Sequence, residues 1–238
     1  MTRLTDAHAH FEGPEELPFR RDVRTVFCGT DPQTARAVLA LAGPGIVPCC
    51  GLHPWQAGRY SVKDMLPFIR QSPVLGEIGL DSVWTDVDMG VQRAAFAEQL
   101  EIAAALGRPV VLHTKGMEAE AARMLEGCPV RKLVHWYSCE DHLERYLEQD
   151  CFFTVGPDWQ SNPAVRRVIA RVPLNRLLTE TDGFGAVGWA LGRPGSPADI
   201  VPALEGELAA IAEARGATPA EAAAIVEDNL HAFIHGPR

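Results

Sequence analysis

Histidines and carboxylates recur at the ends of short apolar segments of this chain. His8 and His10 stand two residues apart in "LTDAHAH", and Glu77 interrupts the apolar run of "VLGEIGL". Further ionisable residues close or follow the segments "PVVLH", "KLVHW" and "RLLTET". The full set consists of histidines and carboxylates: His8, His10, Glu77, His113, His135 and Asp182. These residue types are the usual ligands of Zn²⁺ and related transition-metal ions.

Glu77 is the member of this set that most needs an explanation. A carboxylate buried alone in an apolar strand is so costly that it protonates, pairs with a positive charge or binds a metal. The whole set offers more ligands than one tetrahedral ion requires. We therefore expect two divalent ions, with one oxygen of Glu77 facing each.

Each of these residues also has an ordinary structural interpretation. A single histidine at a strand end is more often a hydrogen-bonded structural residue, and Asp182 in "TETDGFG" can form an Asx-turn. Taken singly, only the pair of His8 and His10 favours a metal site, because residues two apart on a strand share one face. The recurrence of the whole set at strand ends is what favours a common site.

Short apolar segments alternate with longer segments of helical period along the chain, which is typical of a parallel sheet with intervening helices. The expected strands begin at Leu4, Val23, Gly45, Val74, Pro109, Lys132, Cys151 and Arg176. The expected helices cover Pro32 to Ala42, Val62 to Gln71, Val87 to Leu106, Glu118 to Glu126, Glu140 to Glu148, Ala164 to Ala170, Asp199 to Arg215 and Pro219 to Ile234. This order predicts one α/β domain over residues 1–238, a (β/α)₈ TIM barrel.

A barrel would gather the ionisable residues, because active sites of this fold form at the carboxyl ends of the strands. Two further residues are expected at the same end. His53 follows the third strand in "GLHPW", and Lys115 comes just after His113. We expect both to bind substrate; a structural histidine and a solvated loop lysine are equally good interpretations. Asp81 and Glu180 are expected to be structural or to orient a histidine.

Several tryptophans are also predicted near the carboxyl ends of strands: Trp55, Trp84, Trp136 and Trp159. An aromatic ring in such a place can stack against a nucleobase or cover the core. For any one of them, the core is the favoured location. The remaining histidines, His142, His231 and His235, fall in predicted helices and are expected to lie away from the site.

The composition narrows the classes of partner. A formal net charge of −9 argues against a broad basic face for duplex nucleic acid, but it allows a nucleotide bound at a local cationic site. No apolar run approaches the length of a transmembrane helix. A cytoplasmic protein without membrane association is therefore expected, and no oligomeric state is predicted.

The sequence resembles the TatD-like metal-dependent deoxyribonucleases of the amidohydrolase superfamily. The resemblance rests on "DAHAHF", "GLHPW", "GEIGLD", "VVLHTK", "LVHWYS", "LLTETD" and "NLHAF", which occur in the family's order along nearly the whole chain. It implies that His8, His10 and Asp182 hold one metal ion, that His113 and His135 hold a second, and that Glu77 bridges the two. It also implies that Asp182 accepts the proton of the attacking water.

The departures from the family pattern fall beside the expected ligands. Here "TK" follows the histidine of the fifth strand, where the family usually has Ser-Arg, and "WYSC" follows that of the sixth, where Cys-Phe-Ser-Gly is usual. After Asp182 this chain has "GFG" and "GWALGRPGSP" instead of Ala-Pro-Tyr and an Arg-Gly segment, and "GLDSVW" replaces an Asp-Tyr-Tyr-Arg type of sequence. We therefore expect a metal site of the family's kind with altered substrate contacts. The segment from Gly183 to Pro197, rich in glycine and proline, is expected to be a loop.

The predicted function is metal-dependent hydrolysis of a phosphodiester, with single-stranded DNA as the expected substrate. Two divalent ions, Zn²⁺, Mn²⁺ or Mg²⁺, would activate a water molecule, and Asp182 and Glu77 would be the catalytic residues. An alternative is a lactone, ester or amide hydrolase with the same metal site. Many superfamily relatives of that kind bridge their metals with a carboxylated lysine, whereas the fourth strand here offers Glu77. A barrel that binds metal without catalysis is a further alternative.

Overall fold

The strands form one parallel sheet that is rolled into a barrel. The computed structural model describes residues 3–236. Its sheet has the order β1 to β8, with each strand paired in parallel with the next along the chain. The strands are β1 (Leu4–Ala9), β2 (Val23–Gly29), β3 (Ile46–Cys50), β4 (Val74–Asp81), β5 (Val110–Lys115), β6 (Lys132–Val134), β7 (Phe152–Val155) and β8 (Leu177–Thr179). The predicted TIM barrel is confirmed.

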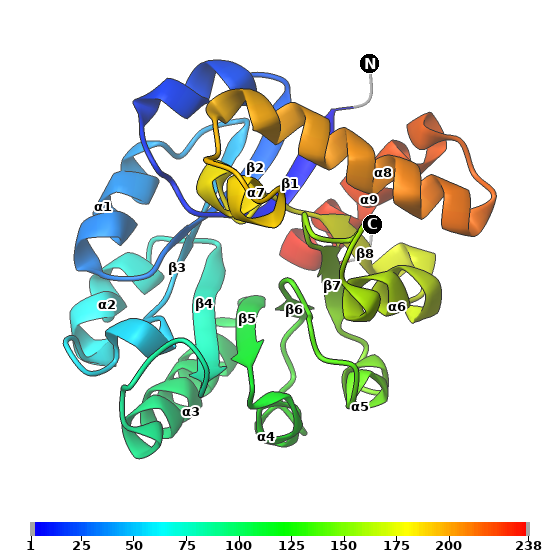
Figure 1. The fold of residues 1–238 in the computed structure, drawn as a ribbon. Helices are drawn as coiled ribbons and strands as arrows, with labels where there is room; N and C mark the ends of the chain where they lie inside the picture. The colour runs from blue at the N-terminus through cyan, green and yellow to red at the C-terminus, as the bar shows by residue number, and fades with distance from the viewer. Residues whose placement is uncertain (1–2, 237–238) are drawn as a thin grey trace.

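Helices cover the outside of the strands (Figure 1). The α-helices are α1 (Pro32–Ala40), α2 (Val62–Ile69), α3 (Met89–Leu106), α4 (Glu118–Met124), α5 (Leu143–Leu147), α6 (Pro163–Arg171), α7 (Phe184–Ala190), α8 (Ile200–Arg215) and α9 (Pro219–His235). Short 3₁₀ helices are η1 (Pro14–Arg20), η2 (Pro54–Gln56), η3 (Leu174–Arg176) and η4 (Pro197–Asp199). None of the helices within residues 3–236 is long and apolar enough to cross a bilayer.

Contacts between β1 and β8 bring the first and last strands together. The backbone of Ala9 forms a parallel bridge with Asp182, and the amide of Asp182 donates to the carbonyl of His8 at 3.0 Å. Deeper in the barrel, the hydroxyl of Thr179 donates to the carbonyl of Thr5 at 2.7 Å. These contacts place a residue that follows β8 directly beside the histidines of β1.

Two helical segments differ from the sequence prediction. The helix expected from Glu140 begins only at Leu143, because His142 adopts a left-handed backbone with φ 64° that an α-helix does not accommodate. The segment from Gly183 to Pro197, read from its glycines and prolines as a loop, contains α7. Gly188 of this helix lies so close to the backbone of Gly195 that a Cβ would fall 2.1 Å from its nitrogen, so this fold of the segment requires glycine.

A buried ion network supports the strand ends beneath the barrel mouth. Arg20 of η1 donates through Nε to Glu16 Oε2 at 2.5 Å and through Nη1 to Asp6 Oδ2 at 2.6 Å. The other oxygen of Asp6 accepts the backbone amide of Thr181 at 2.9 Å. All three charged side chains are buried. The network therefore joins β1, η1 and the residue that precedes Asp182.

We expect Arg20→Ala to lower the free energy of unfolding by about 3–5 kcal/mol, because it leaves the carboxylates of Asp6 and Glu16 buried without a counter-charge. Arg21→Ala, which removes an exposed arginine next to it, is the matched control and should change stability by less than about 0.5 kcal/mol. Urea unfolding followed by circular dichroism measures both. Equal stability of the two variants would show that the network does not stabilise the fold.

Candidate metal centre

The side chain of Glu77 lies at the centre of the barrel mouth. Every residue of β4 is buried, and Glu77 itself is 1% exposed. Its Oε1 lies 2.8 Å from His113 Nδ1 on β5 and 2.7 Å from His135 Nε2 just after β6. The backbones of β4 and β5 are also close at Gly79, where a Cβ would fall 1.8 Å from the carbonyl oxygen of His113.

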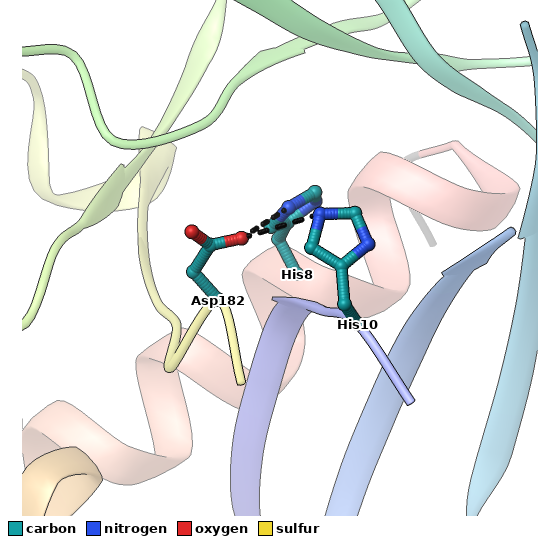
Figure 2. A group of neighbouring side chains, drawn as sticks. All are labelled: His8, His10 and Asp182. Atoms are coloured by element: carbon teal, nitrogen blue, oxygen red, sulfur yellow. Dashed lines mark hydrogen bonds and ion pairs between the residues drawn. The ribbon is translucent and has the colours of Figure 1, made fainter. Parts of the chain in front are cut away.

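A second group of ligand-type atoms faces the other oxygen of Glu77. His8 of β1 and His10 just after it extend toward the carboxylate of Asp182, as Figure 2 shows. Asp182 Oδ1 lies 3.0 Å from His8 Nε2 and 3.4 Å from His10 Nε2. Glu77 Oε2 lies 3.5 Å and 3.3 Å from the same two nitrogen atoms. Glu77 thus stands between two groups of potential ligands and offers one oxygen to each.

All the residues predicted as metal ligands come together at this mouth. Atoms close enough to share an ion occur in overlapping groups: His8 with His10 and Asp182, His8 with Glu77 and His135, and His53 with Glu77 and His113. The strand that contributes each residue is the one expected from the sequence. What the sequence alone did not indicate is the inclusion of His53 in a group with Glu77.

The hydrogen bonds of His53 distinguish it from the other histidines. Its Nδ1 accepts the backbone amide of Trp55 at 3.1 Å, while its Nε2 lies 3.5 Å from Glu77 Oε1. A neutral imidazole that accepts through Nδ1 carries its proton on Nε2. His53 is therefore arranged to donate a hydrogen bond into the site, whereas a metal ligand needs a free lone pair there.

His10 and His113 show the opposite arrangement, with a lone pair directed at the site. His10 Nδ1 donates to the carbonyl of Cys28 at 3.3 Å, which leaves Nε2 as the acceptor. His113 Nε2 donates to Asp81 Oδ2 at 2.8 Å, which leaves Nδ1 facing Glu77. Orientation of a ligating histidine by a carbonyl or carboxylate is a common feature of metal sites.

The charges of the mouth favour an ionised Glu77. Burial raises the pKa of Glu77, but the imidazoles of His135, His53 and His8 outweigh burial and hold the pKa well below its usual range. Burial lowers the pKa of His10, but the neighbouring carboxylates of Glu77 and Asp182 outweigh burial and raise it to about 9. Burial lowers the pKa of His53 to about 4 against the attraction of Glu77, so His53 is neutral at pH 7.

The residues present fit a pair of divalent cations. Glu77 Oε2 is buried and has no hydrogen-bond partner among residues 3–236, although His10 Nε2 lies 3.3 Å away. A buried carboxylate oxygen in that position needs a positive charge close to it. Imidazole nitrogens and carboxylate oxygens on both sides of Glu77 supply the ligand types that such cations require.

Asp81 links the metal centre to the surrounding loops. Besides His113, its Oδ2 accepts the indole Nε1 of Trp55 at 2.7 Å, and its Oδ1 accepts the backbone amides of Val83 and Trp84. The sequence raised Asp81 as a residue that can orient a histidine, and the contact with His113 places it in that position. Glu180 faces His135 Nδ1 at the longer distance of 3.5 Å.

A cavity, which we call the tryptophan cavity, opens beside the histidines. It has a volume of about 360 Å³ and is lined in part by Trp55, Trp84, Trp136, Trp189 and Lys115. Trp159 instead packs against the hydrophobic core, the location favoured for any single tryptophan. Trp189 was not singled out in the sequence, because it lies on α7 within the segment expected to be a loop. His142 directly precedes α5 and is not in the helix predicted for it, whereas His231 and His235 lie on α9; these three histidines lie outside this mouth.

Comparison with known proteins identifies the family of this barrel. A model of the family described as TatD related DNase matches residues 5–235. The chain therefore belongs to the TatD-related DNase family. The metal-dependent hydrolase YcfH of Escherichia coli K12 is 26% identical over 98% of this chain and 96% of that protein. The 3'-5' ssDNA/RNA exonuclease TatD of Edwardsiella piscicida is 31% identical over 56% of this chain and 55% of that protein.

Solved structures of TatD-family proteins share the same barrel. The crystal structure of the TatD homologue YjjV from E. coli K12 superimposes with a TM-score of 0.83 and 25% sequence identity, over 98% of both chains. A TatD-family hydrolase from Entamoeba histolytica has a TM-score of 0.78 at 14% identity, over 99% of both chains, and shows the likeness of fold alone. The chain is thus a metal-dependent hydrolase of the TatD type, as the sequence predicted.

Replacing Asp81 tests whether it holds His113 in the form that can bind metal. In Asp81→Asn, the amide nitrogen can donate to His113 Nε2 and so favour a proton on Nδ1, the atom that faces Glu77. We expect the Kd for Zn²⁺ to rise about 10- to 100-fold, measured by titrating metal-stripped protein in a calorimeter. Asp86→Asn, in the same loop and exposed, should bind like the wild type. Unchanged Zn²⁺ affinity in Asp81→Asn would show that Asp81 serves only the loop.

Proposed function

We propose that this protein hydrolyses phosphodiester bonds of single-stranded nucleic acid, with two divalent cations held around Glu77. The observation that carries this proposal is the position of Glu77, whose two oxygens face separate groups of imidazoles. The name of the Edwardsiella relative, an exonuclease for single-stranded DNA and RNA, supports the choice of substrate. The family's metal-dependent hydrolases support the reaction type.

In this proposal, the two sides of the mouth hold one cation each. His8, His10 and Asp182 would hold the first, His113 and His135 the second, and Glu77 would contact both. Zn²⁺ and Mn²⁺ match the imidazole and carboxylate ligands, and Mg²⁺ is the candidate that prefers oxygen. Cations in these places would supply charge to the phosphoryl oxygens and make a water molecule more acidic.

Asp182 would accept the proton of the attacking water. Its Oδ1 faces His8 and His10. Its partly exposed side chain borders the tryptophan cavity and also the mouth around Glu77, which is lined by His10, His53, His113 and His135 and is called the histidine mouth below. The attraction of His8 and His10 outweighs burial and holds the pKa of Asp182 below its usual range. Asp182 is therefore ionised at neutral pH and able to take a proton.

His53 and Lys115 would contact the phosphate. His53 directs Nε2–H into the mouth, and Lys115 Nζ donates to the neutral hydroxyl of Ser138 at 2.8 Å at the edge of the tryptophan cavity. The net charge of −9 repels a polyanion at long range. Local donors and cations of this kind would have to offset that repulsion at the site.

Glu77→Gln and Asp182→Asn test the proposal in metal-reconstituted protein. We expect each to lower kcat/KM for single-stranded DNA and for bis(p-nitrophenyl) phosphate by about 100- to 10,000-fold, because the first removes a charge shared by both cations and the second removes the base. Glu126→Gln, exposed in the turn after α4, is the control and should retain full activity. The measurement is hydrolysis after stripping and reloading with Mg²⁺, Mn²⁺ or Zn²⁺.

A metal-loaded, folded protein that leaves both phosphodiesters intact would contradict the proposal. If the same protein hydrolysed lactones, esters or N-acyl amides, and lost that activity in Glu77→Gln, the metal site would serve a different bond. Metal content measured by mass spectrometry distinguishes loss of the ions from loss of chemistry in each variant.

A further inference from the structure

We propose that the tryptophan cavity binds one unpaired base of the nucleic-acid strand whose phosphodiester lies at Glu77. This inference rests on the proposed function, because it names the part of the substrate that the neighbouring cavity receives. Trp189 and Trp136 would contact that base from one side of the cavity, and Trp84 and Trp55 would contact it from the other.

The tryptophans reach the cavity from chain segments on both sides of β5. Trp55 and Trp84 follow β3 and β4, whereas Trp136 follows β6 and Trp189 belongs to α7 after β8. β5 lies between these two groups in the order of the sheet. Indole rings that line one cavity from separate strand ends suit a flat aromatic ligand, because every nucleobase offers a face for stacking.

Hydrogen bonds fix one wall of the cavity. Trp136 Nε1 donates to Asp158 Oδ1 at 2.8 Å, and Asn162 Nδ2 donates to the other oxygen of Asp158 at 2.8 Å. The ring of Trp136 lies against Gly156, where a Cβ would fall 2.4 Å from Trp136 Cδ1. Its ring centroid is 5.8 Å from that of Trp189, with the planes inclined at 72°. This wall is therefore formed before a ligand arrives.

The other indoles present exposed apolar surface at the entrance. Trp189 is 65% exposed and Trp84 is 59% exposed, although both line the cavity. The backbone amide of Trp84 is held by Asp81, so its position is tied to the carboxylate that also contacts His113. Large exposed aromatic side chains beside a catalytic mouth are characteristic of ligand contact.

The cavity is continuous with the metal centre. His113, His135 and Asp182 line both the tryptophan cavity and the histidine mouth. A phosphate at Glu77 and a base among the indoles would therefore belong to the same or the adjacent nucleotide. Lys115, at the edge of the cavity, contributes a positive charge that an uncharged aromatic ester or amide would not use.

A cavity of this size, lined by indole rings, favours a single strand over a duplex. A base in a duplex would first have to leave its stack and its partner, at a cost that an unpaired base does not meet. The volume of about 360 Å³ lies at the lower end of the range for small-molecule sites and suits one nucleoside. Stacking tolerates all bases, so we expect affinity for a base with little sequence preference.

Substrates that lack a single base test the inference directly. Short single-stranded oligonucleotides carry an abasic residue at one position at a time and are compared with the intact strand on wild-type, metal-loaded protein. We expect one position at which loss of the base lowers kcat/KM about 5- to 100-fold, the range that one stacked base provides. If no position is sensitive to loss of its base, the inference is overturned.

Variants of Trp189 show whether the sensitivity arises in this cavity. Trp189→Ala should remove most of the difference between the intact and abasic substrates and leave hydrolysis of the abasic one within about twofold of wild type. Trp189→Phe should restore much of the difference. Leu191→Ala, also exposed at the end of α7, is the matched control and should behave as wild type. Equal slowing of both substrates by Trp189→Ala would mean a structural role and overturn the inference.

A binding measurement separates this inference from the proposed function. Fluorescence anisotropy with phosphorothioate oligonucleotides, which resist hydrolysis, reports affinity without turnover. Binding that depends on the base and weakens in Trp189→Ala supports the cavity assignment even if no phosphodiester is cleaved. Cleavage of single-stranded DNA without any dependence on a base or on Trp189 would preserve the proposed function and overturn the inference.

Discussion

The burial of Glu77 among imidazoles is the constraint around which the mouth of this barrel is arranged. A carboxylate that is 1% exposed in a fully buried strand persists as an anion only where positive charge surrounds it. His10 just after β1, His113 on β5 and His135 just after β6 would supply that charge as protons or through bound metal ions. Both states stabilise the same carboxylate, so the arrangement that keeps Glu77 ionised is also the arrangement that would hold divalent cations in the proposed function.

Supporting contacts decide which atom of each histidine faces Glu77. The carbonyl of Cys28 occupies one nitrogen of His10, and Asp81 occupies one nitrogen of His113. Beneath them, the pairing of Arg20 with Asp6 secures the backbone that leads to Asp182. The ionised site therefore depends on groups outside the proposed ligand set, because each of them removes a rotational or protonation alternative from a residue of that set.

The sequence indicates the ligands better than it indicates these supports. Strand periodicity places His8 and His10 on one face, and the barrel geometry gathers the strand ends, so the residues at the mouth follow from local patterns. The bond between Asp81 and Trp55 joins residues 26 positions apart and depends on tertiary contacts that no local pattern contains. α7 was missed for a related reason, since glycines are poor helix formers and its close contact with Gly195 exists only in the folded chain.

The residues that depart from the family pattern lie where this barrel forms the tryptophan cavity. Trp136 directly follows His135, and Lys115 lies two residues after His113. Trp189 lies in the altered segment after Asp182. In a TIM barrel the strand ends hold the reacting groups while the loops vary with the substrate. The ionisable residues around Glu77 can thus keep the same type of reaction. The loops around Trp189 can change which part of a nucleic-acid strand is held beside them.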